Sequence, residues 1–99
     1  MKKIIDNKIY DTDKCDVILE YQTKIPVSTF FGISNPSFQA KILKTQKGTY
    51  LKYIGKCASY NFDDLNEIEI VSEQDVKNLM LEISAVDEYE KVFGKLEEG

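Results

Sequence analysis

The feature that most constrains the fold is a pair of extended segments in the middle of the chain, joined by one tight turn. Residues 38–42 alternate between apolar and polar side chains, and residues 49–54 return with aromatic and branched residues. Such alternation places apolar side chains on one face of a strand. Gly48, which follows Lys47, can adopt the positive φ that a tight turn requires. The sequence therefore predicts a central β-hairpin.

Shorter extended segments lie on either side of this hairpin. Residues 2–5 and 8–10 flank Asp6 and Asn7, which are residue types that tolerate tight turns. Residues 67–71 are rich in isoleucine and valine and predict a further short strand. These segments are further expected strands.

Residues 15–22 leave two interpretations open. Their side chains alternate between apolar and polar at every position except Ile18, and this pattern favours a half-buried strand. A short helix capped by Thr12 or Asp13 is the alternative.

A helix is predicted to begin at Ser72, because residues 72–75 form an approximate capping box with aspartate in the place of glutamate. One apolar stripe recurs along it at helical spacing: Val76, Leu79, Met80 and Ile83.

A second helix is expected to follow, with Asp87 as its N-terminal cap and Gly94 just past its end. Its apolar side chains are Tyr89, Val92 and Phe93. The predicted fold class is therefore α+β. An antiparallel sheet of about four or five strands, built on the central hairpin, packs against one or two C-terminal helices. The 99 residues form one domain.

The segment at residues 25–37 holds both prolines and is expected to be the main loop of the domain. The adjacent Phe30 and Phe31 are unusual there. We expect one ring to lie in the core; the alternative is an exposed aromatic anchor for a partner. A later loop holds Tyr60 and Phe62, which we expect to act as packing anchors.

Missing side chains limit the chemistry that the chain can perform. It contains no histidine, arginine or tryptophan, which excludes an imidazole base and the usual zinc sites. Cys15 and Cys57 lack metal-ligand spacing, and free thiols are favoured over a disulfide. There are two weaker alternatives. One is a Cys57 thiol activated by Lys56, and the other is acid–base or metal chemistry at Asp63 and Asp64. The sequence predicts no enzyme, no cofactor and no metal.

No apolar run approaches the roughly 20 residues that span a bilayer, and the apolar region near the start ends after two residues. We therefore expect no contact with a membrane and a location in the cytosol of a bacterial host.

The two parts of the chain carry opposite charge. Residues 1–60 hold ten lysines and five acids, whereas residues 61–99 hold twelve acids and three lysines. An acidic field attracts a basic surface on another protein, such as a nucleic-acid channel. The expected partner-binding residues are Asp63, Asp64, Glu67, Glu69, Glu73 and Asp75.

The central hairpin supports a different function, because its lysines alternate with tyrosines that can stack on bases. The residues expected to contact nucleic acid in this alternative are Lys41, Lys44, Lys47, Lys52 and Lys56. Lysines on exposed strands also prevent aggregation between sheet edges. A free edge of the sheet can also pair two copies of the chain, so a homodimer is a further expectation.

Three segments resemble a family of small proteins from phages and mobile elements of low-GC Gram-positive bacteria. Residues 2–12 are similar to its "KKIINGKxYDT" start, and residues 44–51 to its central hairpin. Residues 87–98 are similar to its acidic-Tyr-Glu-x-x-Phe-Gly end. Family members usually have a glycine-rich stretch after the hairpin, whereas residues 55–60 of this chain keep a single glycine. Residues 25–36 also match the family poorly.

The resemblance implies an origin on a mobile element and no catalytic residues. Similar small acidic proteins on such elements include inhibitors of host defence, among them anti-CRISPR proteins. The expected function is therefore a protein-binding inhibitor, in its sharpest form an anti-CRISPR. Its acidic half would block the basic channel of a CRISPR-associated (Cas) effector.

Overall fold

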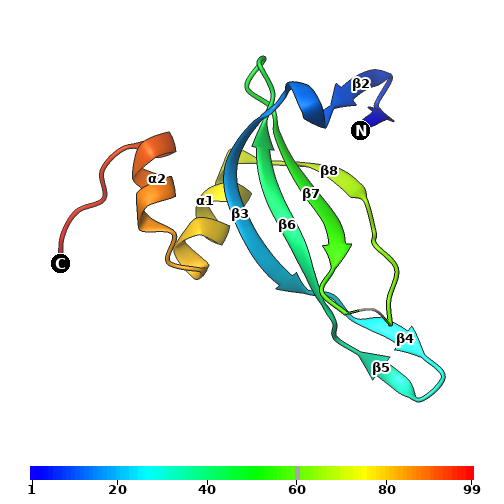
Figure 1. Ribbon diagram of the computed structural model, residues 1–99. Coiled ribbons are helices and arrows are strands. Elements are labelled where there is room, and N and C mark those ends of the chain that lie inside the picture. Colours follow the sequence, from blue (N-terminus) through cyan, green and yellow to red (C-terminus); the bar gives the residue numbers. More distant parts are fainter. Residues whose placement is uncertain (60) are drawn as a thin grey trace.

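A computed structural model describes residues 1–59 and 61–99 and has an α+β fold (Figure 1). Its main sheet is antiparallel, with the strand order β3-β6-β7-β8. Two separate two-stranded hairpins, β1–β2 and β4–β5, lie outside this sheet. The elements are β1 (Lys2–Ile5), β2 (Lys8–Asp11), the 3-10 helix η1 (Thr12–Lys14), β3 (Asp16–Lys24), β4 (Val27–Thr29), β5 (Gly32–Ser34), β6 (Ser37–Lys44), β7 (Tyr50–Cys57), β8 (Glu67–Val71), α1 (Glu73–Glu82) and α2 (Val86–Phe93).

The central hairpin is confirmed as the pair β6–β7. Gly48 has a φ of +90°, so the turn uses the conformation that glycine permits. The turn is closed by Thr45, whose hydroxyl accepts a hydrogen bond of 3.0 Å from the Thr49 N–H. These local bonds set the register in which Leu43 lies opposite Leu51.

Strand β3 is also confirmed, and its irregular residue has a structural explanation. Val17 and Leu19 pair with consecutive residues of β6, which leaves Ile18 as the extra residue of a β-bulge. The bulge explains why the alternation fails at that position. The helix that was the alternative is reduced to the single 3-10 turn η1.

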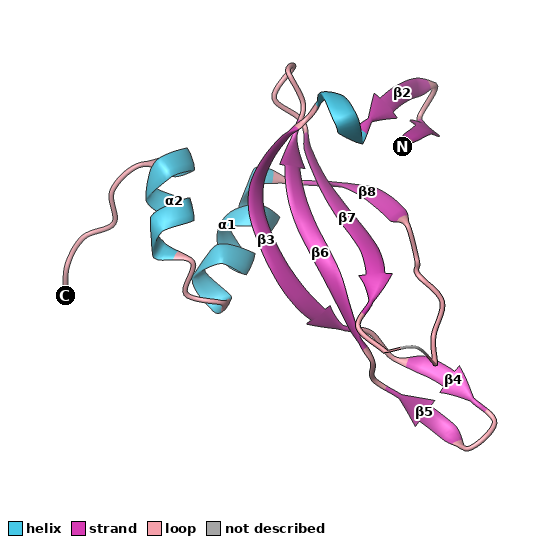
Figure 2. Cartoon of the chain, viewed as in Figure 1, coloured by secondary structure: helices cyan, strands magenta, loops and turns pink. Residues whose placement is uncertain are grey.

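Both helices cover the same face of the main sheet (Figure 2). The buried residues between them and the sheet form the helix-side core: Leu19, Ile42, Tyr50, Val76 and Met80. Tyr89 and Phe93 of α2 pack against it with ring centroids 5.3 Å apart. Each fully buried apolar side chain of the helix-side core stabilises the folded state by about 1.5–3 kcal/mol.

Helix α1 begins as predicted, with a complete capping box. The Ser72 hydroxyl accepts a bond of 3.0 Å from the Asp75 N–H, and the Asp75 carboxylate accepts one of 3.1 Å from the Ser72 N–H. The bond from the Ser72 N–H to the carboxylate, and after it the nearby Ser72 hydroxyl, hold the pKa of Asp75 below its ordinary value. The expected apolar stripe is buried at Val76 and Met80, whereas Ile83 lies at the exposed end.

The expected cap of α2 was wrong. The helix begins two residues earlier, with Ala85 as its N-cap and no side-chain capping bond. Ser84, with a φ of +57°, turns the chain sharply before the helix, and Asp87 lies in the first turn. A carboxylate there still stabilises the helix through its dipole. The predicted end at Gly94 is confirmed, with a φ of +99°.

The other face of the sheet has its own buried cluster, which we call the hairpin-side core: Leu43, Leu51 and Ile68. The β1–β2 hairpin covers it with Ile5 and Tyr10, and Cys15 packs beside them. The predicted turn of this hairpin is confirmed, because Asp6 and Asn7 both have positive φ. Each face of the sheet is thus covered by a different end of the chain.

Predictions for the two cysteines, for the loop that holds Tyr60 and Phe62, and for membrane-spanning segments can also be compared with the structure. Both cysteines are free thiols; Cys57 is buried and Cys15 half-buried. Phe62 is half-buried, whereas Tyr60 lies outside the described residues. Among the residues described, no helix is long and apolar enough to cross a membrane.

Candidate functional site

The candidate site is a small β-hairpin that projects from one end of the molecule (Figure 1). It consists of β4, β5 and the turn between them, and we call it the finger. The sequence predicted only a loop at residues 25–37. The strands form because Val27 pairs with Ser34 and Thr29 pairs with Gly32, which leaves two residues for the turn.

Those two turn residues are Phe30 and Phe31. Their exposed fractions are 96% and 95%, so the expectation that one ring lies in the core was wrong. The rings contact each other edge to face, with centroids 5.4 Å apart and planes at 85°. Ile33, 73% exposed, extends the apolar surface along β5.

The turn that presents the rings is ordered by its own hydrogen bonds. The Thr29 hydroxyl donates to the Gly32 carbonyl at 2.7 Å and accepts from the Phe31 N–H at 3.3 Å. Gly32 has a φ of +117°, which a residue with a side chain rarely adopts. At the base of the finger, the Ile25 N–H donates to the Pro36 carbonyl at 3.2 Å. The rings are therefore held outward by a defined turn.

The surface of the finger is uncharged, since residues 25–37 contain no lysine, aspartate or glutamate. Burying one phenylalanine side chain contributes about 1.5–3 kcal/mol of stabilisation. The folded chain buries neither Phe30 nor Phe31, so neither contribution is made within the chain. Clusters of exposed aromatic side chains mark binding sites and often carry most of the binding energy.

The loop that carries Asp63 and Asp64 begins at the base of the finger. There the Ala58 N–H donates to the carbonyl of Ser37, the first residue of β6, at 2.9 Å. Asp64 has a structural role, because its carboxylate accepts a bond of 3.0 Å from the Cys57 N–H. Asp63 is exposed. Two of the predicted acidic residues thus lie on a segment that begins beside the base of the finger.

The other four predicted acidic residues follow along the edge of the sheet. Glu67 and Glu69 lie on the edge strand β8, and Glu69 is opposite Lys52. Glu73 lies 3.8 Å from Lys77 in an ion pair, and Asp75 belongs to the capping box. Half of the acidic set, Asp64, Glu73 and Asp75, therefore takes part in local structure.

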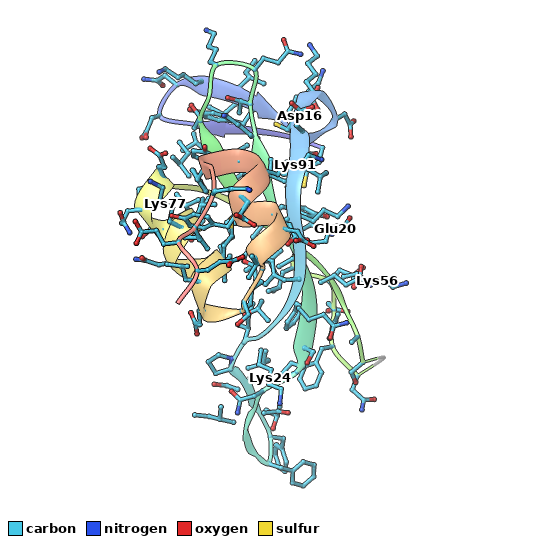
Figure 3. The ribbon with its side chains drawn as sticks, turned by 90° about the vertical axis from the view of Figure 1, so that its left-hand side faces the viewer. Asp16, Glu20, Lys24, Lys56, Lys77 and Lys91 are labelled. Carbon is cyan, nitrogen blue, oxygen red and sulfur yellow. The ribbon has the colours of Figure 1, made fainter. Side chains whose placement is uncertain are left out.

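The predicted lysines do not follow a single face. Lys44 and Lys52 lie on the helix side of the sheet, with Lys44 at 5.4 Å from the Tyr50 ring centre. Lys41 lies on the opposite side, 3.7 Å from the Glu20 carboxylate. Lys47 is in the β6–β7 turn, and Lys56 projects outward (Figure 3). These five residues do not form one continuous track.

The thiol chemistry of Cys15 is that of a protonated side chain. Burial raises its pKa, and the nearby carboxylates of Asp11 and Asp16 raise it further. Its Sγ donates to the Asp11 carbonyl at 3.3 Å. Since the thiolate is the reactive form, this residue is a poor nucleophile at neutral pH. Within residues 1–59 and 61–99, no group of three or more His, Cys, Asp or Glu side chains is placed to hold a metal.

Comparison of the chain with known proteins found no family model, no curated protein and no solved structure that matches it. The finger, with its two outward rings, remains the most distinctive surface of the molecule.

Proposed function

We propose that the protein acts by binding another protein, with the finger as its anchor. The observation that carries this proposal is the exposure of Phe30 and Phe31 on an ordered turn. Two aromatic side chains on a narrow projection fit an apolar pocket in a partner. Aromatic anchors in such pockets are typical hot spots of protein interfaces.

The acidic loop beside the finger extends the proposal to the charge of the partner. Asp63 is free of internal bonds in the described part of the chain, and Glu67 continues the acidic surface onto β8. We propose a partner whose apolar pocket adjoins a basic surface, such as the nucleic-acid channel of a defence nuclease. In the sharpest form, the protein is an inhibitor carried by a mobile element and blocks a Cas effector.

The finger is tested by comparing three tagged proteins in an extract of a low-GC Gram-positive bacterium treated with nuclease. They are the native chain, Phe30→Ser/Phe31→Ser, and the matched control Ile4→Ser/Ile9→Ser. The control removes two side chains that are each 71% exposed on the other hairpin. We expect a protein that copurifies with the native chain and the control but is lost with the finger variant. Equal recovery with all three folded proteins would contradict the proposal.

The acidic contribution is tested by reversing charge where no internal bond is lost. Asp63→Lys/Glu67→Lys leaves the Asp64 bond to Cys57 intact. Glu97→Lys/Glu98→Lys is the matched control, with the same change in net charge at the C-terminal end. We expect the first variant to bind the partner at least about tenfold more weakly than the control. If both variants bind equally, the acidic loop is not part of the interface.

Nucleic-acid binding by the hairpin lysines remains the alternative function. It predicts recovery of DNA or RNA that falls steeply with salt. It also predicts loss of that recovery when Lys41, Lys44, Lys52 and Lys56 are changed to glutamine. The finger variant would leave nucleic-acid recovery unchanged in that case.

A further inference from the structure

A groove lies at the end of the molecule opposite the finger, between the β1–β2 hairpin and the β6–β7 turn (Figure 1). Its volume is about 660 Å³. Segments far apart in the sequence form its walls: residues 8–15 on one side and residues 45–49 on the other. We call it the lysine groove.

Four lysines line this groove and come from separate elements: Lys2 of β1, Lys8 of β2, Lys14 of η1 and Lys47 of the β6–β7 turn. None of the four lies within 4.0 Å of a carboxylate in residues 1–59 and 61–99. The one acidic residue of the lining is Asp11, whose carboxylate already accepts a bond from the Asp13 N–H at 3.1 Å. The lining therefore carries more positive than negative charge.

The rest of the lining adds apolar and hydrogen-bonding groups. Tyr10 forms an aromatic wall, Ile9 adds an apolar group from the opposite face of β2, and Thr45, Gln46 and Thr49 provide hydroxyl and amide groups. Tyr10 also packs on the hairpin-side core, so this wall is fixed. Sites for small molecules typically have volumes of about 300–1,000 Å³ and combine apolar walls with a few polar groups.

We propose that the lysine groove binds a phosphorylated ligand of nucleotide size. The lysine ammonium groups would bind the phosphates as charge-assisted hydrogen-bond donors, and the base would lie against Tyr10. This inference is independent of the finger, which lies at the other end of the molecule.

The test is calorimetric titration of the full chain with ATP, free of divalent cations, at about 0.1 M salt. We expect saturable binding with one site per chain. Inorganic tripolyphosphate should bind more weakly, because it lacks a base to contact Tyr10. Failure to detect any binding of ATP at millimolar concentration would overturn the proposal.

Matched lysine variants separate a specific groove from general attraction by charge. Lys2→Gln/Lys8→Gln/Lys14→Gln should weaken ATP binding at least about tenfold, whereas Lys24→Gln/Lys56→Gln/Lys95→Gln should leave it unchanged. Both variants lose three positive charges. An equal loss of affinity in both would overturn the assignment to this groove.

Two further measurements locate the ligand and define its class. Cys15 lines the groove whereas Cys57 is buried elsewhere, so ATP should slow alkylation of Cys15 in peptide-resolved mass spectrometry. Unchanged alkylation at saturating ATP would place the ligand elsewhere and overturn the proposal. Binding of a twelve-nucleotide single strand without binding of ATP would also overturn it, in favour of a nucleic-acid surface.

Discussion

The two hairpins outside the main sheet resemble each other in form but differ in how their side chains are used. Each consists of two short antiparallel strands joined by a tight turn. The β1–β2 hairpin is attached to the sheet through Ile5 and Tyr10, and Lys3 donates a bond of 3.2 Å to the Ile68 carbonyl. The finger contributes no buried residue to either core. Its contacts with the domain are at its base.

This difference shows which apolar side chains the fold itself leaves exposed. A two-stranded hairpin is only marginally stable in water unless it packs against something else. The β1–β2 hairpin obtains that support inside the domain. The finger keeps its largest apolar groups, Phe30 and Phe31, outside the domain, and a partner protein would supply the missing contact.

The largest expected effect is a loss of folding stability when the core beneath the β1–β2 hairpin is altered. Leu51 is fully buried in the hairpin-side core, on which Tyr10 packs, and Leu51→Ala should lower the free energy of unfolding by about 2–5 kcal/mol. Urea unfolding followed by circular dichroism measures this change. In contrast, Ile33→Ala in the finger should change the same quantity by less than about 0.5 kcal/mol. Equal losses would mean that the finger is also supported by the core.

The next effect concerns the cap of α1, which holds the helix over the other core. Ser72→Ala removes a side-chain acceptor for the Asp75 N–H and should lower the unfolding free energy by about 1 kcal/mol. Ser72→Asn, which can cap a helix, should restore most of that loss. An unchanged midpoint for Ser72→Ala would show that the capping box is not formed in solution.

The same cap predicts a dependence on pH. The pKa of Asp75 is lowered from 3.8 in the folded chain, so the ionised carboxylate stabilises the folded state above that pH. This stabilisation is lost as the pH falls below 3.8 through the folded pKa. Stability measured across this range should therefore fall more steeply for the native chain than for Asp75→Asn. Parallel curves would contradict the role assigned to the carboxylate.

A smaller effect is expected at Tyr21, whose hydroxyl is buried in the helix-side region without a hydrogen-bond partner among the described residues. Burial raises its pKa to about 12, and the charge of Glu69 adds to the shift. Tyr21→Phe removes an unsatisfied polar group and should leave stability unchanged or slightly higher. Tyr53→Phe is the control, because it loses a bond of 2.9 Å to Asn66 and should be slightly less stable. A clear loss for Tyr21→Phe would indicate a partner for that hydroxyl.

The smallest effect on stability is expected at the tip of the finger. Phe30→Ser/Phe31→Ser should shift the unfolding midpoint by no more than a typical surface substitution, within about 0.5 kcal/mol. The measurement is urea unfolding of the same preparation used for partner capture. A loss above about 2 kcal/mol would mean that the rings support the fold of the isolated chain.

The sequence was sufficient wherever a local pattern decides the structure. Alternation predicted β6 and β7, and the serine and aspartate of the capping box predicted the start of α1. At Ile18 the alternation failed because a β-bulge inserts one extra residue there. The side chains after the bulge therefore point to the opposite face of the sheet from the one that continued alternation would give. Ala85 replaced Asp87 as the cap of α2 because the backbone at Ser84 decides where that helix begins.

The candidate sites depended on features that a local pattern does not contain. Hydrophobicity alone places phenylalanines in the core, and the rings of Phe30 and Phe31 are exposed because they occupy a two-residue turn. The absence of charge at residues 25–37, together with Thr29 and Gly32 around the pair, was the signal for an outward turn. The lysine groove requires residues 8–15 and 45–49 to meet, which only the tertiary fold achieves.

The most direct test of the finger as the protein-binding element is photo-crosslinking with p-benzoylphenylalanine at two matched exposed positions. The side chain would replace Phe31 at the tip of the finger in one protein and Ile4 on the β1–β2 hairpin in the other. Both are irradiated in the same nuclease-treated Gram-positive extract. We predict one discrete protein adduct at position 31, competed by unmodified native chain and absent at position 4. The same adducts at both positions, or none at position 31, would contradict it.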